Sequence, residues 1–250
     1  MLSKMYLRYT SAGYLMISPG DDCRQIVDAM LATGYDEEFC VALDFSPGFV
    51  ARLMEAGFLV MSADISNPEE NEEPAYVLLP KLHLVRSALF FENLHIKKSI
   101  RRFLNRYELR PDADFEFILD RCVRVHGADW LTPPLVESIK KIREAALPDT
   151  PPAAGALPAV HAYPTSFALY RNGILVAGEF GVIAQRVYTS YSGYYDEPNA
   201  GTVQLILATR YLQAQGFTFF DLGMPLEYKT DLGAVDITPE QFVELFRNRK

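Results

Sequence analysis

The sequence has few cysteines, no long apolar run and no excess of positive charge. Its three cysteines (Cys23, Cys40 and Cys122) are scattered, odd in number and without Cys-x-x-Cys spacing, which argues against a disulfide framework or a cysteine zinc site. No window offers the roughly 18 uninterrupted apolar residues of a membrane span, and the first residues lack the apolar core of a signal peptide. The sequence therefore predicts a cytoplasmic globular protein with reduced thiols and no membrane contact.

Several catalytic signatures are also missing. The four histidines include no two at helical spacing with a third ligand nearby, so no metal is expected. The sequence has neither a Gly-x-Ser-x-Gly nucleophile elbow nor a Gly-x-x-x-x-Gly-Lys phosphate loop. The formal net charge of −8 argues against wholesale coating by nucleic acid but allows a local basic patch.

The most informative stretch runs from Thr165 to Gly233. Two apolar runs flank Asn172-Gly173, a dipeptide that favours a tight hairpin turn. A loop, a helix over 202–215 and a buried strand over 217–222 are expected to follow. The order strand, turn, strand, loop, helix, strand predicts an α+β, GNAT-like acyltransferase fold, in which a splayed sheet opens a cleft for the acyl donor.

The chain divides into two expected domains. Residues 1–65 suggest a small N-terminal α/β domain with helices over 24–33 and 48–56 and a strand over 57–62. Residues 66–250 would form the GNAT-like domain, with strands over 76–79 and 82–85. Further helices are expected over 115–126, 135–146 and 240–247, the last capped by Thr238.

The most basic stretch is predicted to form a helix over 95–107. Its apolar residues fall on one helical face, and its cations occupy the others without a local counter-charge. These cations are Lys97, Lys98, Arg101, Arg102 and Arg106. One interpretation is a solvated helix face, and the other is a phosphate-contacting helix that binds RNA by displacing counterions.

Two features bear on acyl-transfer chemistry. Asp221 ends an apolar strand, where it could orient a substrate or accept a proton, with its pKa raised by burial. It could equally be a structural partner of Lys229 or of a backbone amide. The segment before the central helix, residues 197–201, holds one glycine and a proline that removes an amide donor, which disfavours coenzyme A binding.

Five motifs in order resemble the leucyl/phenylalanyl-tRNA–protein transferases. They are Leu-His-Ile-Lys-Lys-Ser-Ile-Arg-Arg at 94–102, Trp-Leu-Thr-Pro at 130–133, Asn-Gly-x-Leu-Val-x-Gly-x-x-Gly-Val at 172–182, Phe-Asp-x-x-x-Pro at 220–225 and Leu-Gly-Ala-x-x-Ile-x-x-x-x-Phe at 232–242. Residues 57–61 also resemble the family's Gly-Ile-Phe-Pro-Trp segment. The resemblance spans residues 50–246.

The resemblance implies transfer of leucine or phenylalanine from aminoacyl-tRNA to the N-terminal amine of an acceptor protein, which marks that protein for degradation. It implies no metal and no cofactor. The basic stretch would contact the tRNA acceptor stem, chiefly through Lys98 and Arg101. Trp130 would lie by the terminal adenosine, where Met61 replaces a family tryptophan. The pocket for the amino-acid side chain would comprise Tyr188, Leu205 and Phe220.

Two other site positions depart from the family pattern. Tyr191 stands where the family has the glutamate expected to hold the substrate α-amino group, and Gly223 stands where it has a glutamine implicated in catalysis. The leading hypothesis is a divergent aminoacyl-tRNA–protein transferase with chemistry near Asp221. The alternatives are a GNAT-type transferase with another acyl donor and a non-catalytic binder of tRNA or protein N-termini.

Overall fold

The hairpin at Asn172-Gly173 forms the centre of the molecule. In the computed structural model, which describes residues 7–66, 73–146 and 162–248, it joins β7 (Tyr163–Arg171) to β8 (Ile174–Ala184). Asn172 and Gly173 have φ angles of 53° and 78°, the positive values that the sequence pattern predicts. β8 in turn pairs antiparallel with β9 (Val187–Tyr195).

These strands belong to a seven-stranded sheet in the order β11-β5-β10-β9-β8-β7-β6. After β9 the chain passes through α6 (Ala200–Ala214) to β10 (Phe220–Asp221), which runs parallel to β9. The remaining strands are β5 (Arg86–Leu89), β6 (Glu108–Pro111) and β11 (Val235–Ile237). The α+β class is as the sequence predicts. The loop expected between the hairpin and the central helix is wrong, because β9 occupies residues 187–195 and a third strand precedes α6.

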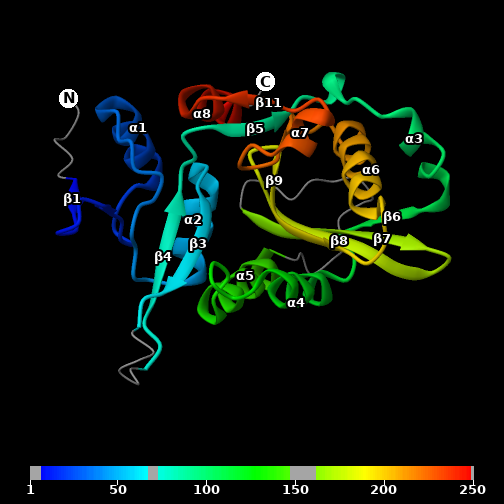
Figure 1. The fold of residues 1–250 in the computed structure, drawn as a ribbon. Coiled ribbons are helices and arrows are strands. Elements are labelled where there is room, and N and C mark those ends of the chain that lie inside the picture. The colour runs from blue at the N-terminus through cyan, green and yellow to red at the C-terminus, as the bar shows by residue number, and fades with distance from the viewer. Residues whose placement is uncertain (1–6, 67–72, 147–161, 249–250) are drawn as a thin grey trace.

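Helices cover both faces of the sheet (Figure 1). α4 (Phe115–His126) and α5 (Pro133–Ala146) lie against one face, and α6 lies against the other. Gly181 on β8 allows a close approach within this arrangement. A Cβ there would lie 2.2 Å from the Thr189 carbonyl oxygen and 2.7 Å from the Tyr188 hydroxyl, so only glycine lets the Tyr188 side chain cross β8.

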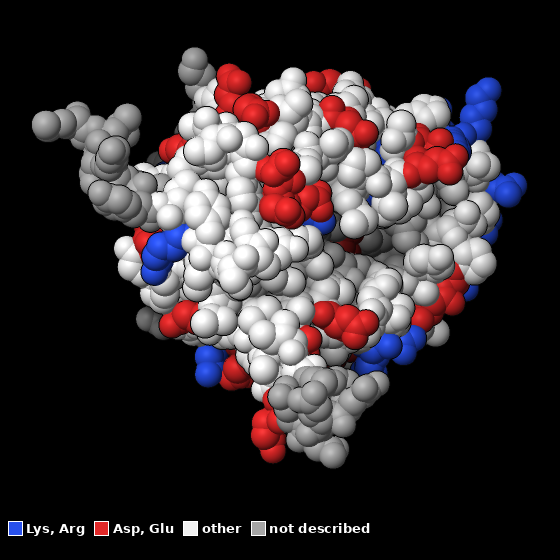
Figure 2. Space-filling model, turned by 60° about the vertical axis from the view of Figure 1, so that its left-hand side comes forward, with Lys and Arg blue, Asp and Glu red and all other residues white. Residues whose placement is uncertain are grey.

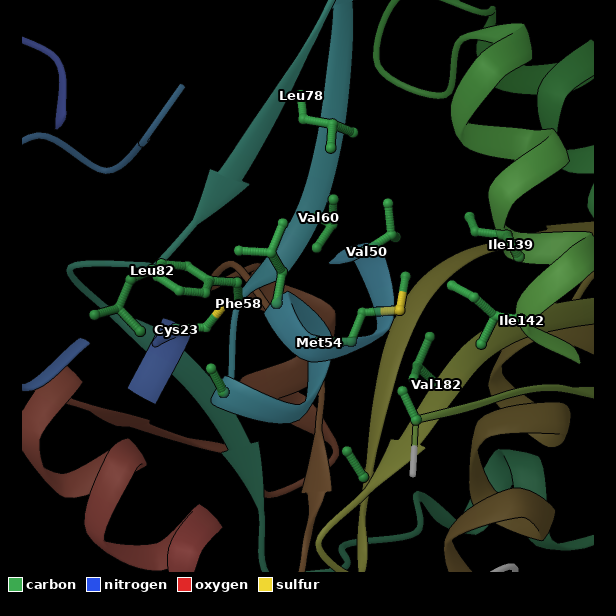
Figure 3. Packing of buried hydrophobic residues seen from close by; sticks show 14 of the residues in the cluster. Cys23, Val50, Met54, Phe58, Val60, Leu78, Leu82, Ile139, Ile142 and Val182 are labelled. Carbon is green, nitrogen blue, oxygen red and sulfur yellow. The ribbon is translucent and has the colours of Figure 1, made fainter. Parts of the chain in front are cut away.

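The N-terminal elements pack beside the sheet. They are β1 (Arg8–Tyr9), β2 (Leu15–Met16), α1 (Cys23–Thr33), α2 (Pro47–Ala56), β3 (Leu59–Asp64) and β4 (Tyr76–Lys81). One hydrophobic core includes them and the sheet. Figure 3 shows Val50 and Met54 of α2, Val60 of β3, Ile142 of α5 and Val182 of β8 gathered around it. The β3–β4 pair also straddles the expected boundary at 65/66, which stays a prediction.

Helix ends follow the capping signals in the sequence. The Asp22 carboxylate accepts hydrogen bonds from the backbone amides of Arg24 and Gln25 at the start of α1. Thr238 and Gln241 form a reciprocal capping box at the start of α8 (Pro239–Arg247). The short α7 (Glu227–Asp231) lies between β10 and β11. All three cysteines are buried and free.

The basic stretch differs from its prediction. The single helix expected over 95–107 is wrong: the structure has 3₁₀ turns at Phe91–Asn93 and Leu104–Arg106 around one short helix, α3 (Lys98–Arg101). Tertiary contacts hold this path. The His95 amide donates to the Leu232 carbonyl, and a Cβ at Gly233, where φ is 99°, would lie 1.9 Å from the Asn93 oxygen.

The strand expected over 82–85 is also displaced. Leu82 to Val85 form an irregular connection, and the strand that follows is β5, beginning at Arg86. Of the described residues, none lies in a helix long and apolar enough to cross a membrane.

Candidate active-site cleft

The sheet opens between β9 and β10. The two strands share only two register pairs, Phe220 with Tyr188 and Asp221 with Thr189. Beyond these pairs, Ser190 to Gly193 on β9 are half-buried, whereas Val187 to Thr189 are buried. Because β10 has only two residues, β9 extends beyond it without a β10 partner, at the place where the sequence predicts that the sheet opens. Figure 2 shows a hollow near the middle of one face, with acidic atoms visible in its depth.

Asp221 lies at the base of the splay and is fully buried. Its Oδ1 accepts hydrogen bonds from Arg86 Nε and from the Gly223 amide, each with a donor–acceptor distance of 3.0 Å. Its Oδ2 accepts a hydrogen bond from Thr189 Oγ1 at 2.8 Å. Arg86 is also buried, donates to the Gly57 carbonyl over 2.9 Å and stacks 3.7 Å above the Phe242 ring centroid. The carboxylate is thus charge-paired and triply bonded, which favours a positioning role over proton transfer.

Strand β3 forms one wall of this region. The Val60 amide donates to the Tyr191 hydroxyl over 3.0 Å. Two residues along β3, the Ser62 amide donates to the Trp130 carbonyl over 2.9 Å. Met61 lies between these two contacts and is half-buried, as is Trp130. The structure therefore brings Met61, Trp130 and Tyr191 together.

Gly223 also adjoins this wall, since a Cβ on it would be 3.7 Å from Leu59 and 3.8 Å from His83 Nε2. Burial and the nearby cations Arg86, Lys81 and Lys229 lower the pKa of His83 to about 2. His83 is therefore a neutral imidazole beside the turn that follows Asp221.

The predicted side-chain pocket is a packed aromatic cluster. Tyr188 and Phe220 are fully buried, with ring centroids 5.2 Å apart in an edge-to-face arrangement. Leu205 of α6 is half-buried and packs on the same cluster. The three residues lie together on the α6 face of the sheet.

A second buried carboxyl group adjoins this cluster. Glu179 on β8 is only 3% exposed. Burial raises its pKa to about 7, while Ser190, Gln204, Tyr188 and the charge of Lys229 act in the opposite direction. Ser190, Gln204 and Tyr188 lower the pKa as hydrogen-bond partners of the carboxyl group, although no contact of Oε1 has ideal geometry in the described part of the chain.

Lys229 on α7 is also buried near these carboxyl groups. It is 6% exposed, and its Nζ donates to the carbonyls of Leu222 and Met224. Burial lowers its pKa, opposed by the charges of Glu179 and Asp221. It does not bond to Asp221. Of the two structural partners considered for Asp221, the backbone amide is therefore present, at Gly223, whereas Arg86 takes the place of Lys229.

The basic segment, residues 94–107, packs its apolar side chains Ile100 and Leu104 into the same cluster as Val203 and Ile206 of α6. Its cations are exposed. Lys97 pairs with Asp231 of α7 at 2.5 Å, a counter-charge that lies far away in the sequence. Only the start of the basic segment, at His95 and Lys97, contacts the end of α7, while α3 lies beyond α6 (Figure 1).

Among the other cations, Arg102 and Arg106 stack on the Phe103 ring at 4.8 and 5.1 Å. The Arg101 Nε donates to the Ile96 carbonyl over 3.2 Å. These contacts hold guanidinium groups on the surface without neutralising them.

The start of α6 already holds an anion. Glu197, half-buried, pairs with Arg171 at 2.6 Å just before the helix begins. A carboxylate there competes with a phosphate for the positive end of the helix dipole. In the described residues, no group of three or more His, Cys, Asp or Glu side chains is placed to hold a metal ion.

Sequence reasoning missed Arg86, Glu179 and His83. The available signal was a charged or titratable residue within an apolar strand: Glu179 interrupts the run from Ile174 to Ala184, and Arg86 precedes Ser-Ala-Leu-Phe-Phe. Such residues are rarely buried without a partner or a function.

The seven-stranded sheet, the helices on both of its faces and the buried charges define an α+β protein. A model of the family described as leucyl/phenylalanyl-tRNA protein transferase matches residues 88–247, well over half of the chain. The chain therefore belongs to the leucyl/phenylalanyl-tRNA–protein transferase family, which confirms the resemblance drawn from the five motifs.

Curated relatives bear the same family name. The leucyl/phenylalanyl-tRNA–protein transferase of Novosphingobium aromaticivorans is 26% identical over 204 residues, covering 80% of this chain and 68% of the relative. That of Campylobacter lari is 23% identical over 206 residues, covering 82% and 87%. A solved GCN5-related N-acetyltransferase from Kribbella flavida is 15% identical with a TM-score of 0.36, covering 88% of this chain and 73% of that one; so distant a likeness carries no argument.

Proposed function

We propose that this protein transfers an aminoacyl group from charged tRNA to the N-terminal amine of an acceptor protein. The family match over residues 88–247 is the observation that supports this function most strongly. It includes the splay between β9 and β10, the turn after Asp221 and the basic segment. The amino acid would resemble leucine or phenylalanine, as the family name suggests.

The RNA would lie along the basic segment, held by Lys97, Lys98, Arg101, Arg102 and Arg106. Exposed cations that are free to move toward phosphates suit this role, whereas Lys97 would first exchange Asp231 for a phosphate. The terminal adenosine would contact Met61 and Trp130 along β3, and the acyl group would enter between β9 and β10. Tyr188, Leu205 and Phe220 would bound the amino-acid side chain once their packed cluster opened to admit it.

The reaction needs little chemical assistance because the ester is already activated. The neutral acceptor amine attacks the ester carbonyl, an amide bond forms and the ester C–O bond breaks. The proton released by the amine passes to the departing 3′ oxygen of the tRNA. Orientation and polar stabilisation would supply most of the acceleration. Asp221, through Thr189 and the Gly223 amide, would position the turn beside the ester.

A transfer assay tests this function directly. The full chain is incubated with a mixed pool of charged tRNAs bearing labelled amino acids and a peptide that begins with arginine. Incorporation of label into the peptide is expected, dependent on both tRNA and protein. Absence of incorporation from every charged tRNA would contradict the proposal.

The basic segment is tested in parallel. The double variant Lys98→Glu/Arg101→Glu should weaken tRNA binding and reduce the slope of log affinity against log salt by about 2. A matched control, Arg124→Glu/Lys141→Glu on α4 and α5, makes the same change of charge elsewhere and should leave the slope unchanged. Equal effects of the two double variants would mean that net charge, not this segment, governs binding.

A second candidate is a non-catalytic binder of tRNA or protein N-termini, favoured by the complete burial of Asp221. It predicts tRNA binding sensitive to the same double variant, without turnover. A coenzyme A-dependent transferase is disfavoured by the Glu197–Arg171 pair at the start of α6, and thermal stabilisation by coenzyme A would support it instead. The expected domain boundary at 65/66 divides the paired strands β3 and β4, and we propose to test it by expressing 66–250 alone.

A further inference from the structure

We propose that a pocket at the end of α1 binds a lysine or arginine side chain of the acceptor polypeptide, a few residues downstream of the reacting N-terminal amine. This inference rests on the proposed function and adds a second contact for the acceptor, outside the opening between β9 and β10. The side chain meant here is not that of the acceptor's first residue. The pocket would hold the extended acceptor while its amine lies near the turn after Asp221.

The pocket lies where three parts of the fold meet. Its volume is about 240 Å³, and it is formed by the end of α1, the connection between β4 and β5, and the start of α8. Apolar side chains of Met30, Leu31, Leu82 and Leu84 line it. Pockets for drug-sized ligands occupy about 300–1,000 Å³, so this one suits a single side chain better than a nucleotide or a cofactor.

Two carboxylates give the pocket negative charge. Asp36 and Glu240 are exposed lining residues, and neither has an ion-pair partner among the residues that the structure describes. The neighbouring cation Lys81 is already paired with Glu38 at 2.7 Å. A hydrogen bond from the Thr238 side chain lowers the pKa of Glu240, which is therefore charged at neutral pH. The pocket thus offers two unpaired negative charges to an incoming cation.

The end of α1 adds to this negative charge. Its last turn holds no basic residue, and the helix ends at Gly34, whose amide donates to the Leu31 carbonyl. The C-terminal end of a helix attracts cations. The Tyr35 hydroxyl accepts a hydrogen bond from the Leu15 amide and donates to the Phe39 carbonyl, which fixes the Tyr35 ring as a pocket wall. An aliphatic stem with a positive end matches these surroundings.

Exposed apolar side chains lead from the pocket toward the turn after Asp221. The Ser87 amide donates to the Gly223 carbonyl, so this turn lies against the chain three residues beyond Leu84. Three residues span at most about 11 Å, a distance that an extended acceptor covers in three or four residues. The large apolar side chains exposed on both sides of this contact are Leu84, Val85, Met224, Leu226 and Tyr228.

A lysine scan of the acceptor tests the pocket in the transfer assay. The peptides begin with arginine, continue with alanine and serine, and carry one lysine at position 3, 4, 5, 6 or 12, with a lysine-free peptide as reference. In the wild type, lysine at one of positions 3 to 6 should raise kcat/KM by about 3- to 10-fold, and lysine at position 12 should not. Asp36→Asn/Glu240→Gln should lose this preference. The control Glu116→Gln/Glu144→Gln removes two exposed charges on α4 and α5 and should keep it.

The other outcomes contradict the proposal in distinct ways. Equal kcat/KM for every peptide in the wild type would overturn the pocket without reference to any variant, while transfer itself persists. A preference that survives in a folded Asp36→Asn/Glu240→Gln, or one that is as strong for position 12, would assign the attraction to net charge and also overturn it. Failure of the proposed function differs, because then no charged tRNA supports transfer to any peptide. Anisotropy of the same peptides, labelled at their C-terminal end, still measures whether lysine at positions 3 to 6 strengthens binding.

Discussion

Asp221 and Glu179 are both buried carboxyl groups on strands of one sheet, yet their surroundings differ. Asp221 has a guanidinium, a hydroxyl and a backbone amide directed at it. Glu179 has only the neutral side chains of Ser190, Gln204 and Tyr188 as hydrogen-bond partners, and burial raises its pKa to about 7. The comparison teaches that burial alone does not determine how a carboxyl group is held in the fold. What distinguishes the two groups is whether a charged side chain is hydrogen-bonded to the carboxyl, as Arg86 is to Asp221.

The largest effect should come from removing the partner of Asp221. Arg86→Met leaves a buried charge without compensation and should lower the free energy of unfolding by about 3–5 kcal/mol. Denaturant titration measures the loss. The control Lys141→Met removes one member of the exposed Lys141–Glu137 pair and should cost less than about 1 kcal/mol. Similar losses in the two variants would remove the distinction between the carboxyl groups.

Glu179 should instead affect how stability depends on pH. Because its pKa in the folded protein, about 7, exceeds the ordinary value of 4.5, its stabilising contribution is complete below pH 4.5 and is lost as the pH rises through 7. The unfolding free energy of the wild type relative to Glu179→Gln should therefore fall by about 3 kcal/mol across this range and then level off. Glu116→Gln should show a constant difference. A difference that rises with pH would mean that Glu179 is charge-stabilised.

The smallest expected effects on stability concern Thr189 and Tyr188, two adjacent residues of β9. Thr189→Val removes a hydrogen bond to Asp221 and should destabilise the fold by about 1–3 kcal/mol. Tyr188→Phe removes a hydroxyl whose contact with Glu179 lacks ideal hydrogen-bond geometry and should change stability by less than about 0.5 kcal/mol. Both are measured by the same denaturant titration. Equal losses would show that the Tyr188 hydroxyl is bonded in solution.

Local signals in the sequence predicted most of the elements. Asn172-Gly173 and Thr238 specify a turn and a cap through interactions within a few residues. The basic segment was mispredicted because its apolar residues repeat at helical spacing, while its path is set by distant contacts from Leu232 and Gly233. Periodicity describes one face of a segment, and here tertiary packing overrides it.

The site was less predictable than the fold. Asp221 was identified from its place at a strand end, but its partner Arg86 lies 135 residues away in sequence. Glu179 was overlooked because its neighbours come from three elements. The resemblance to the family supplied Met61, Trp130 and Tyr191, and the structure then brings these residues together along β3.

β10 and β9 are joined by only two residue pairs. This junction divides the sheet into two groups of strands, β11, β5 and β10 on one side and β9, β8, β7 and β6 on the other. Because so few backbone hydrogen bonds join the two groups, a small rotation of one group against the other breaks few of them. Such a rotation would separate β9 from β10 while the pairing within each group is kept. Backbone amides at the β9–β10 junction should then exchange with deuterium faster than those between β7 and β8. An acyl ligand that contacts both groups of strands should slow that exchange.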